Sequence, residues 1–346
     1  MNRREFLIST AVTGAAMAFL PRLAQAQAAP EVTEISLGFG LDPVFAPHIV
    51  AMQKGWLEEA GFTSVTTTSF TAGALAGEAL LAGEIQLWTP GNLPPISMAH
   101  TSIPVVVLGT NCIAADADRL VARPEANIKA PEDLYNARIG LLAGSTASVT
   151  LSQLARHYGL DESRLQVVNM PPPEQLAALN AGEIDAFLCW QPWGHNALSS
   201  GAVLVHSGTT SGFEQNEGEE VQISATRSIF VASQDFVREN PNATRALMGA
   251  LVRGQSYVSD PANREEVLSL VSAETGQEQE VVEAIWDQYV FDPTFDERYV
   301  ADMQTMTDYL SSSGRIEEAM DPLSYTYTEP AAEAGVTVEV AGTWQP

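Results

Sequence analysis

Two stretches of the chain repeat one order of expected elements, and this repeat constrains the fold more than any other feature. The order is strand, turn, helix, strand, helix, strand, and it runs over residues 33–88 and again over residues 138–188. Short alternating or apolar runs are typical of strands, and a glycine follows each helix where a helix commonly ends. Each stretch therefore predicts a β-α-β-α-β unit with right-handed crossovers and a parallel sheet.

One phrase marks the same place in both stretches. Leu80–Ile85 and Leu179–Ile184 share the order Leu-x-Ala-Gly-Glu-Ile, which combines a helix end, a closing glycine and the start of a buried strand. The phrase is short and its residues are common, so the shared order of elements around it carries more weight than the phrase itself.

The repeat predicts an α/β protein of two parallel-sheet lobes. A length of 346 residues exceeds what one compact core commonly holds, which also favours two domains. The mostly helical stretch from Gln234 to about Gly314 contains no third unit, so we expect it to pack back onto the first lobe. We assign residues 29–112 and 235–346 to lobe I and residues 113–234 to lobe II, joined by a two-segment hinge that closes on a ligand.

Residues 1–26 have the composition of an export signal peptide. Arg3 and Arg4 precede an apolar stretch from Leu7 to Leu20, and Ala24-Gln25-Ala26 has the form of a cleavage site. The order Arg-Arg-x-Phe-Leu resembles the twin-arginine signal, although a plain Sec signal can carry two arginines by chance. We therefore expect an exported, periplasmic protein.

Only two cysteines, Cys112 and Cys189, occur in the chain. Neither lies near the expected cleavage site, so we expect no lipid anchor there. In an oxidising compartment they form a disulfide or remain as two free buried thiols, and the sequence leaves both alternatives open.

The charge and the missing motifs exclude several functions. The chain has 17 Lys and Arg residues against 43 Asp and Glu, a formal charge of −26, which opposes binding to nucleic acid or to anionic membranes. Its five histidines lack the spacing of a metal site, and no dinucleotide loop, Walker loop or nucleophile elbow occurs. We therefore expect no cofactor, no metal and no enzymatic activity.

A ligand site is expected between the lobes, because ligands of open parallel sheets bind beyond the carboxyl ends of the strands. Four segments follow such ends, two from each lobe: residues 41–47, 88–95, 144–148 and 190–193. The third, Gly144-Ser-Thr-Ala-Ser148, offers free backbone N–H groups at a helix start, which bind anions. An ordinary helix cap by Ser145 or Thr146 is the alternative.

Aromatic and polar side chains occur in the same segments. Trp88, Trp190 and Trp193 either form an aromatic wall, which could also hold a cationic amine, or serve as lids of the core. Asn92 and Gln191 add neutral donors and acceptors beside them. Arg227, at the expected second crossing between the lobes, either clamps a carboxylate, sulfonate or nitrate or is an exposed residue paired with an acid.

Several stretches in order along the chain resemble the nitrate/sulfonate/taurine family of ABC-importer solute-binding proteins. They are Asp42–Pro47, Gln53–Leu57, Leu80–Ile85, Leu120–Arg123, Ala130–Leu134 and Asn180–Trp193. The resemblance implies a type II periplasmic binding protein fold, with permease and ATPase subunits supplied by other chains. The family's ligand positions fall here on Phe45, Trp88, Thr89, Asn92, Ser145, Thr146, Ala147, Trp190, Gln191 and Pro192.

The sequence thus predicts a monomeric, extracytoplasmic solute-binding protein that is not embedded in a membrane. Its expected ligand is a small organic anion such as a taurine-like sulfonate. A nitrate or pyrimidine-precursor binding protein, an enzyme on the same fold and a sensory binding module remain alternatives. The candidate ligand-binding residues are the ten family positions together with Arg227.

Overall fold

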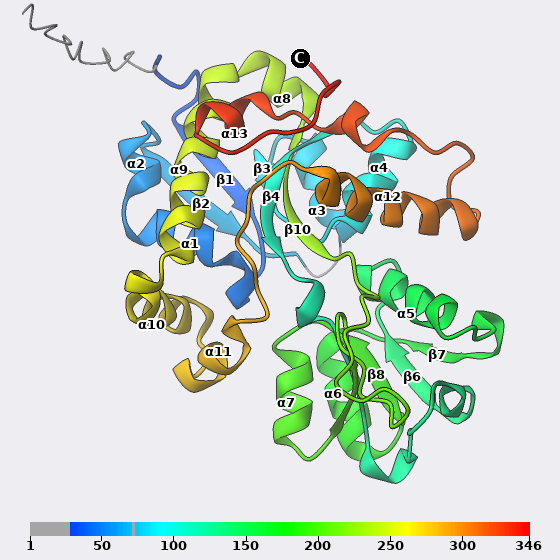
Figure 1. Ribbon diagram of the computed structural model, residues 1–346. Helices are drawn as coiled ribbons and strands as arrows, with labels where there is room; N and C mark the ends of the chain where they lie inside the picture. Colours follow the sequence, from blue (N-terminus) through cyan, green and yellow to red (C-terminus); the bar gives the residue numbers. More distant parts are fainter. Residues whose placement is uncertain (1–27, 71–72) are drawn as a thin grey trace, which may run out of the picture.

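A computed structural model describes residues 28–70 and 73–346 and shows two α/β lobes joined by crossing segments (Figure 1). The expected export signal, residues 1–26, lies outside the described residues. Each lobe contains one five-stranded sheet.

Sheet A builds lobe I in the order β2-β1-β3-β10-β4. Its strands are β1 (Glu34–Gly38), β2 (Ser64–Thr68), β3 (Leu87–Trp88), β4 (Val105–Ile113) and β10 (Arg227–Ser233). β1 pairs in parallel with both β2 and β3, as the repeat predicts. β4 is buried along its whole length, which fits the unbroken apolar run Val105–Leu108 at its start.

Sheet B builds lobe II in the order β7-β6-β8-β5-β9. Its strands are β5 (Arg119–Ala122), β6 (Arg138–Leu141), β7 (Gln166–Asn169), β8 (Ala186–Cys189) and β9 (Val203–Ser207). β6 pairs in parallel with β7 and β8. The second predicted unit therefore forms the core of its own sheet, as the first one does.

Both sheets are mixed, because antiparallel pairs adjoin the parallel strands of the two predicted units. β5 runs antiparallel to β8 and β9, and β10 runs antiparallel to β3 and β4. Both strands come directly after a crossing between the lobes, so they start at the edge where the parallel strands end. A strand that enters a sheet from that edge must run against its parallel neighbours.

The second crossing also lies earlier than we assigned it. β10 belongs to sheet A, so residues 227–234 are part of lobe I and not of lobe II. The reason is packing, since the six residues Arg227–Ala232 are buried between β3 and β4.

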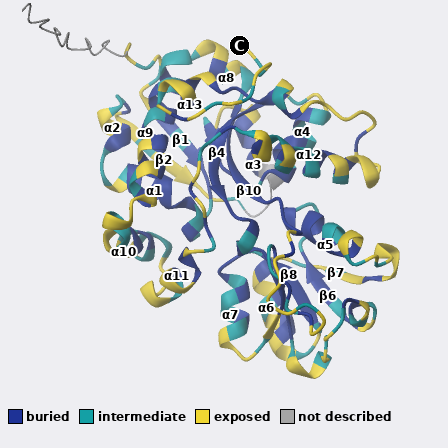
Figure 2. Cartoon of the chain, viewed as in Figure 1, coloured by how far each residue is buried: buried dark blue, intermediate teal, exposed yellow. Residues whose placement is uncertain are grey.

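The helices cover the faces of the two sheets, and the burial pattern shows their outer sides exposed (Figure 2). In lobe II these are α5 (Thr146–His157), α6 (Pro172–Ala181) and α7 (Trp193–Ser199). In lobe I they are α1 (Ala46–Gln53), α2 (Trp56–Glu59), α3 (Gly73–Leu81), α4 (Leu93–His100), α8 (Gln234–Glu239), α9 (Pro241–Ser259), α10 (Arg264–Thr275), α11 (Gln279–Trp286), α12 (Glu297–Ser312) and α13 (Glu329–Glu333).

The helical third of the chain packs on lobe I, as expected. α9 lies against α1, and α12 lies against α4 and reaches α5 of the other lobe. α9 approaches α1 closely because Gly254 has no side chain, and a Cβ there would lie 2.4 Å from the carbonyl oxygen of Pro47. After α12, Thr326 bridges to β4 at Val107, so the C-terminal segment also joins lobe I.

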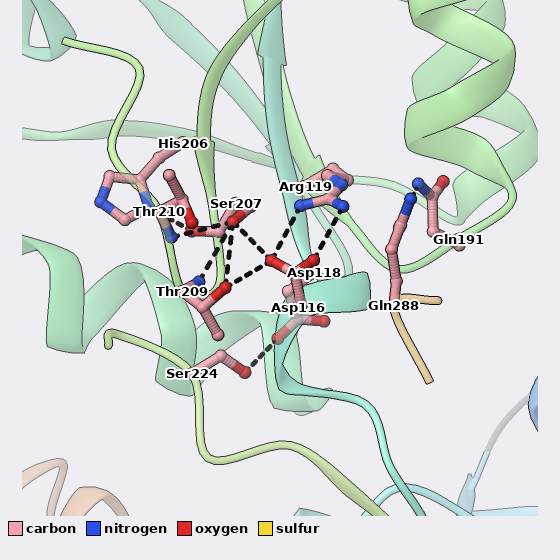
Figure 3. A network of polar contacts seen from close by, with 10 residues as sticks. All are labelled: Asp116, Asp118, Arg119, Gln191, His206, Ser207, Thr209, Thr210, Ser224 and Gln288. Atoms are coloured by element: carbon pink, nitrogen blue, oxygen red, sulfur yellow. Dashed lines mark hydrogen bonds and ion pairs between the residues drawn. The ribbon is translucent and has the colours of Figure 1, made fainter. Parts of the chain in front are cut away.

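The two crossings form one hydrogen-bonded hinge, shown in part in Figure 3. Asp118, on the first crossing, accepts hydrogen bonds from Ser224 (2.7 Å) and Thr226 (2.8 Å) on the second, and from Thr150 of α5 (2.7 Å). Nearby, Asp116 accepts from both terminal nitrogens of Arg119 at 3.2 Å. The hinge segments are therefore held side by side by a buried carboxylate.

Both cysteines are free and buried, Cys112 in β4 and Cys189 at the end of β8. This arrangement corresponds to the second of the two alternatives, because the thiols lie in different sheets. Burial raises the pKa of both thiols. Among the helices within the described residues, none is both long and apolar enough to span a membrane.

Candidate functional site

A cavity of about 560 Å³ lies between the lobes, at the carboxyl ends of four parallel strands. Residues directly after β1, β3, β6 and β8 all contribute to its lining. These are the positions that the strand-end rule predicts. The volume falls within the range of pockets that enclose small organic ligands.

Six aromatic residues form part of the wall. The rings that line the cavity come from both lobes and are Phe39, Phe45, Phe70, Trp88, Trp190 and Tyr289. Phe39 and Phe45 also pack on each other, with ring centroids 5.5 Å apart. Of the two interpretations of the tryptophans, Trp88 and Trp190 fit the wall, whereas Trp193 packs with the core of lobe II.

The start of α5 presents unpartnered backbone N–H groups to this cavity. The Ser145 hydroxyl donates to the carbonyl oxygen of Leu142 at 2.7 Å and makes no cap to the helix. Ser148 N–H donates to the carbonyl of Ser145, but no described residue accepts from the N–H of Thr146 or of Ala147. Because Gly144, Ser145 and Thr146 line the cavity, these N–H groups are available to an anion there.

Arg227 does not offer its guanidinium to the cavity. Its Nε donates to Asp302 at 2.7 Å and its Nη1 to Thr110 at 3.1 Å, and the group lies over the ring of Tyr299. Only 1% of the residue is exposed, so the prediction of an exposed arginine is wrong. The predicted pairing with an acid is present, because Arg227 forms an ion pair with Asp302. Arg227 lines the cavity while its charge is neutralised inside lobe I.

The structure brings most of the candidate residues together around one cavity. Those that line it are Phe45, Trp88, Thr89, Ser145, Thr146, Trp190, Gln191 and Arg227. Asn92, Ala147 and Pro192 do not line it. The Asn92 side chain instead donates to the carbonyl of Ala225 at 3.0 Å and accepts from the N–H of Arg227, which fixes the second crossing to α4.

Four polar residues of the wall were not among the candidates: Asp42, Thr226, Ser228 and Tyr289. Asp42 lies within a segment that the strand-end rule selected, and a charged residue in that turn could have marked it as a candidate. Tyr289 follows α11 in the helical third of the chain, where no strand-end argument applies. Its hydroxyl is buried and has no hydrogen-bond partner among the described residues.

Burial controls the ionisation of the groups beside the cavity. It raises the pKa of Asp42 to about 6, and it lowers the pKa of His48 to about 3. Asp42 is partly exposed, so contact with solvent weakens this effect of burial on its pKa. His48 is therefore neutral near pH 7, and its Nε2 lies 3.0 Å from the Thr89 hydroxyl.

The lobes touch each other around the cavity. Gln191 Nε2 donates to Gln288 Oε1 at 2.8 Å, which links lobe II to the segment after α11 (Figure 3). Gly91 of lobe I lies against Thr146 of lobe II, where an added Cβ would lie 2.9 Å from the Thr146 methyl group. Arg315 follows α12, and its Nη1 would lie 4.0 Å from a Cβ added to Gly144.

No metal centre is found in the part of the chain that the structure describes. Within residues 28–70 and 73–346, no three His, Cys, Asp or Glu side chains are grouped so that they could hold a metal ion. The groups available in the cavity are backbone amides, hydroxyls, the side-chain amide of Gln191, aromatic rings and one carboxyl group.

Solved structures and characterised proteins are similar to this chain in fold or in sequence. The alkanesulfonate-binding protein SsuA from Xanthomonas axonopodis pv. citri, bound to MOPS, superposes with a TM-score of 0.72 at 19% identity, over 86% of this chain and 99% of that one. That likeness confirms the predicted α/β fold of a type II periplasmic binding protein.

Two relatives align over much of the chain. The taurine-binding periplasmic protein of Escherichia coli (strain K12) is 25% identical over 216 residues, which cover 62% of this chain and 64% of that protein. The nitrate/nitrite binding protein NrtA of Synechococcus elongatus is 24% identical over 293 residues, which cover 76% of this chain and 63% of that protein. The chain thus matches just under two thirds of the length of each.

A family model covers most of the chain. The model described as the NMT1-like family matches residues 28–272, which include both repeated units, both crossings and the four cavity segments. The family resemblance expected from the sequence is therefore confirmed, and the chain belongs to the NMT1-like family.

Proposed function

We propose that the protein is the extracytoplasmic solute-binding component of an ABC importer and that it captures a small organic anion such as a sulfonate. The observation that carries the proposal is the pairing of an aromatic wall with the unpartnered N–H groups of α5 in one cavity between hinged lobes. Amides at a helix start stabilise an anion without a formal positive charge, and the rings bury its organic part.

The named relatives support this assignment. The taurine-binding and nitrate/nitrite binding proteins are binding proteins by name, and the former is periplasmic. By analogy, this chain acts as a monomer in the periplasm and delivers its ligand to permease and ATPase subunits on other chains. The proposed contacts are the eight candidate residues that line the cavity, with Asn92, Ala147 and Pro192 supporting them from behind.

The cavity favours an organic ligand over nitrate. A volume of about 560 Å³ is large for an anion of four atoms, and six rings offer mainly apolar contact. A ligand with a carbon skeleton would bury those rings, whereas nitrate alone would leave most of the cavity to water.

A thermal-shift screen of the purified protein tests the proposal, using sulfonates, nitrate, amino acids, quaternary amines and pyrimidines. A ligand present at 100 times its dissociation constant adds about 2.7 kcal/mol to the free energy of unfolding. We expect a sulfonate to produce the largest shift. A shift produced only by pyrimidines or nitrate, or turnover of any candidate, contradicts the proposal.

The variant Trp190→Ala separates binding from folding. We expect it to abolish the ligand-induced shift, because it removes a ring of the wall. Trp193→Ala is the matched control: it removes a ring from the core of lobe II, so it lowers the melting temperature but leaves the ligand-induced shift. Unchanged affinity in Trp190→Ala removes Trp190 from the site.

A further inference from the structure

A carboxyl group lies in the cavity without a protein partner. Asp42 follows β1 and lines the cavity, and its side chain makes no hydrogen bond to the helical turn that it precedes or to any other described residue. A Cβ added to Gly40 would lie 3.7 Å from Asp42 Oδ2 and 3.0 Å from Cε2 of the Phe45 ring. The carboxylate and the ring are therefore neighbours.

The wall provides no positive charge to balance this carboxylate. Arg227 is the only basic residue among the described residues that line the cavity, and its guanidinium is bound to Asp302 and Thr110. Burial alone accounts for the raised pKa of Asp42, without a contribution from any charged neighbour. An unpaired buried carboxylate is unfavourable unless a ligand supplies the opposite charge.

A second unpartnered group lines the same cavity. The Tyr289 hydroxyl is buried without a hydrogen bond, and Tyr289 itself is only 7% exposed. Burial raises the pKa of Tyr289, and both Tyr289 and Asp42 line this one cavity. Aromatic faces surround them, and such faces attract cations.

We propose that Asp42, Tyr289 and the adjoining rings form a subsite for a positively charged nitrogen, so that the ligand is a zwitterion with its anionic end at the start of α5. The anionic half of this assignment rests on the proposed function, whereas the cationic half rests on the unpartnered Asp42 carboxyl group, the Tyr289 hydroxyl and the adjoining rings. The subsite selects amino or alkylammonium sulfonates and carboxylates, and it disfavours nitrate and simple alkanesulfonates. A carboxylate and aromatic faces can bind either a protonated amine or a quaternary ammonium group, so the subsite accepts both kinds of nitrogen.

Two pairs of probes measure the charge preference by titration calorimetry. Taurine has an ammonium group where isethionate has a hydroxyl. Choline has a quaternary nitrogen where 3,3-dimethylbutan-1-ol has a carbon. For the wild-type protein we expect the member of each pair that carries a cationic nitrogen to bind at least ten times more tightly than the member that lacks it.

The isosteric variant Asp42→Asn should remove this preference. We expect at least a tenfold loss of affinity for taurine or choline and no loss for isethionate. Tyr289→Phe keeps the ring and should weaken only the member with the cationic nitrogen, by a few fold. Glu84→Gln, an exposed residue after α3, is the control that should change nothing.

Each outcome decides the matter. A preference that survives in Asp42→Asn, an equal loss for both members of a pair, or no preference in the wild type overturns the subsite. If choline binds through Asp42 but no sulfonate binds, the subsite stands and the proposed anionic ligand fails. If isethionate binds as well as taurine, the proposed function stands and the subsite fails. If no probe of either pair binds, the zwitterionic assignment is overturned.

Discussion

At the scale of single residues, Asp42 illustrates how a binding site opposes stability. Its folded-state pKa of about 6 lies above the ordinary value of 3.8, so the folded protein holds this proton more tightly than the unfolded chain. The free energy of unfolding therefore falls as the pH rises from about 4 to 6, and it remains lower at higher pH. The opposite holds for His48, whose lowered pKa makes protonation destabilising as the pH falls below 6.5.

A stability measurement tests this interpretation of Asp42 without any ligand. We expect Asp42→Asn to raise the free energy of unfolding by about 2 kcal/mol at pH 8, after a discount for partial exposure, and by almost nothing at pH 4. Urea denaturation of both proteins at the two pH values gives the comparison. An equal gain at both values would mean that the carboxylate charge is not the cause.

At the scale of elements, the sequence predicts what local patterns determine. The parallel cores β2-β1-β3 and β7-β6-β8 follow from alternating strands, helix-closing glycines and the rule of right-handed crossovers. The direction of β5 and β10 was not predictable in that way, because each is set by the side from which the chain re-enters a lobe. An apolar run such as Ile229–Ala232 fits either lobe equally well, so its pattern alone cannot choose the sheet.

The hinge depends on one buried carboxylate whose role no sequence motif indicates. Asp118 accepts hydrogen bonds from Thr150, Ser224 and Thr226, which lie 32, 106 and 108 residues further along the chain. Its partners are ordinary hydroxyls at irregular spacing, so only the folded chain identifies them. Loss of the carboxylate would leave three buried hydroxyls without their acceptor.

We therefore expect Asp118→Ala to lower the free energy of unfolding by about 3 kcal/mol, and Thr150→Val, which removes one of the three donors, by about 1 kcal/mol. Chemical denaturation with a single folding probe in each lobe provides the measurement. If Asp118→Ala costs no more than Thr150→Val, the carboxylate does not organise the hinge.

At the scale of the whole molecule, the location of the site was predictable and part of its composition was not. The strand-end rule selected four segments, and all four contribute residues to the cavity. Tyr289 escaped prediction because its place depends on how the helical third folds back over lobe I. Arg227 lies beside the cavity as expected, but its charge is taken by Asp302, a partner 75 residues away that no local pattern reveals.

Closure of the two lobes depends on how near they can approach, and Gly91 marks a point of contact. A Cβ at Gly91 would lie 2.9 Å from the Thr146 methyl group, closer than such atoms pack, and 3.7 Å from the Thr146 hydroxyl, which is an ordinary contact. We therefore expect Gly91→Ala to hold the lobes apart and to weaken the best ligand of the thermal-shift screen about tenfold. The radius of gyration with ligand, measured by small-angle scattering, should exceed that of the wild type.

The second-site change Thr146→Ser distinguishes a clash from general damage. Serine keeps the hydroxyl but lacks the methyl group, so it should restore affinity and compactness in the double variant while changing little alone. A double variant that binds as weakly as Gly91→Ala would show that the methyl contact does not limit closure. Such a result would point to another contact between the lobes at the cavity, such as the Gln191–Gln288 hydrogen bond.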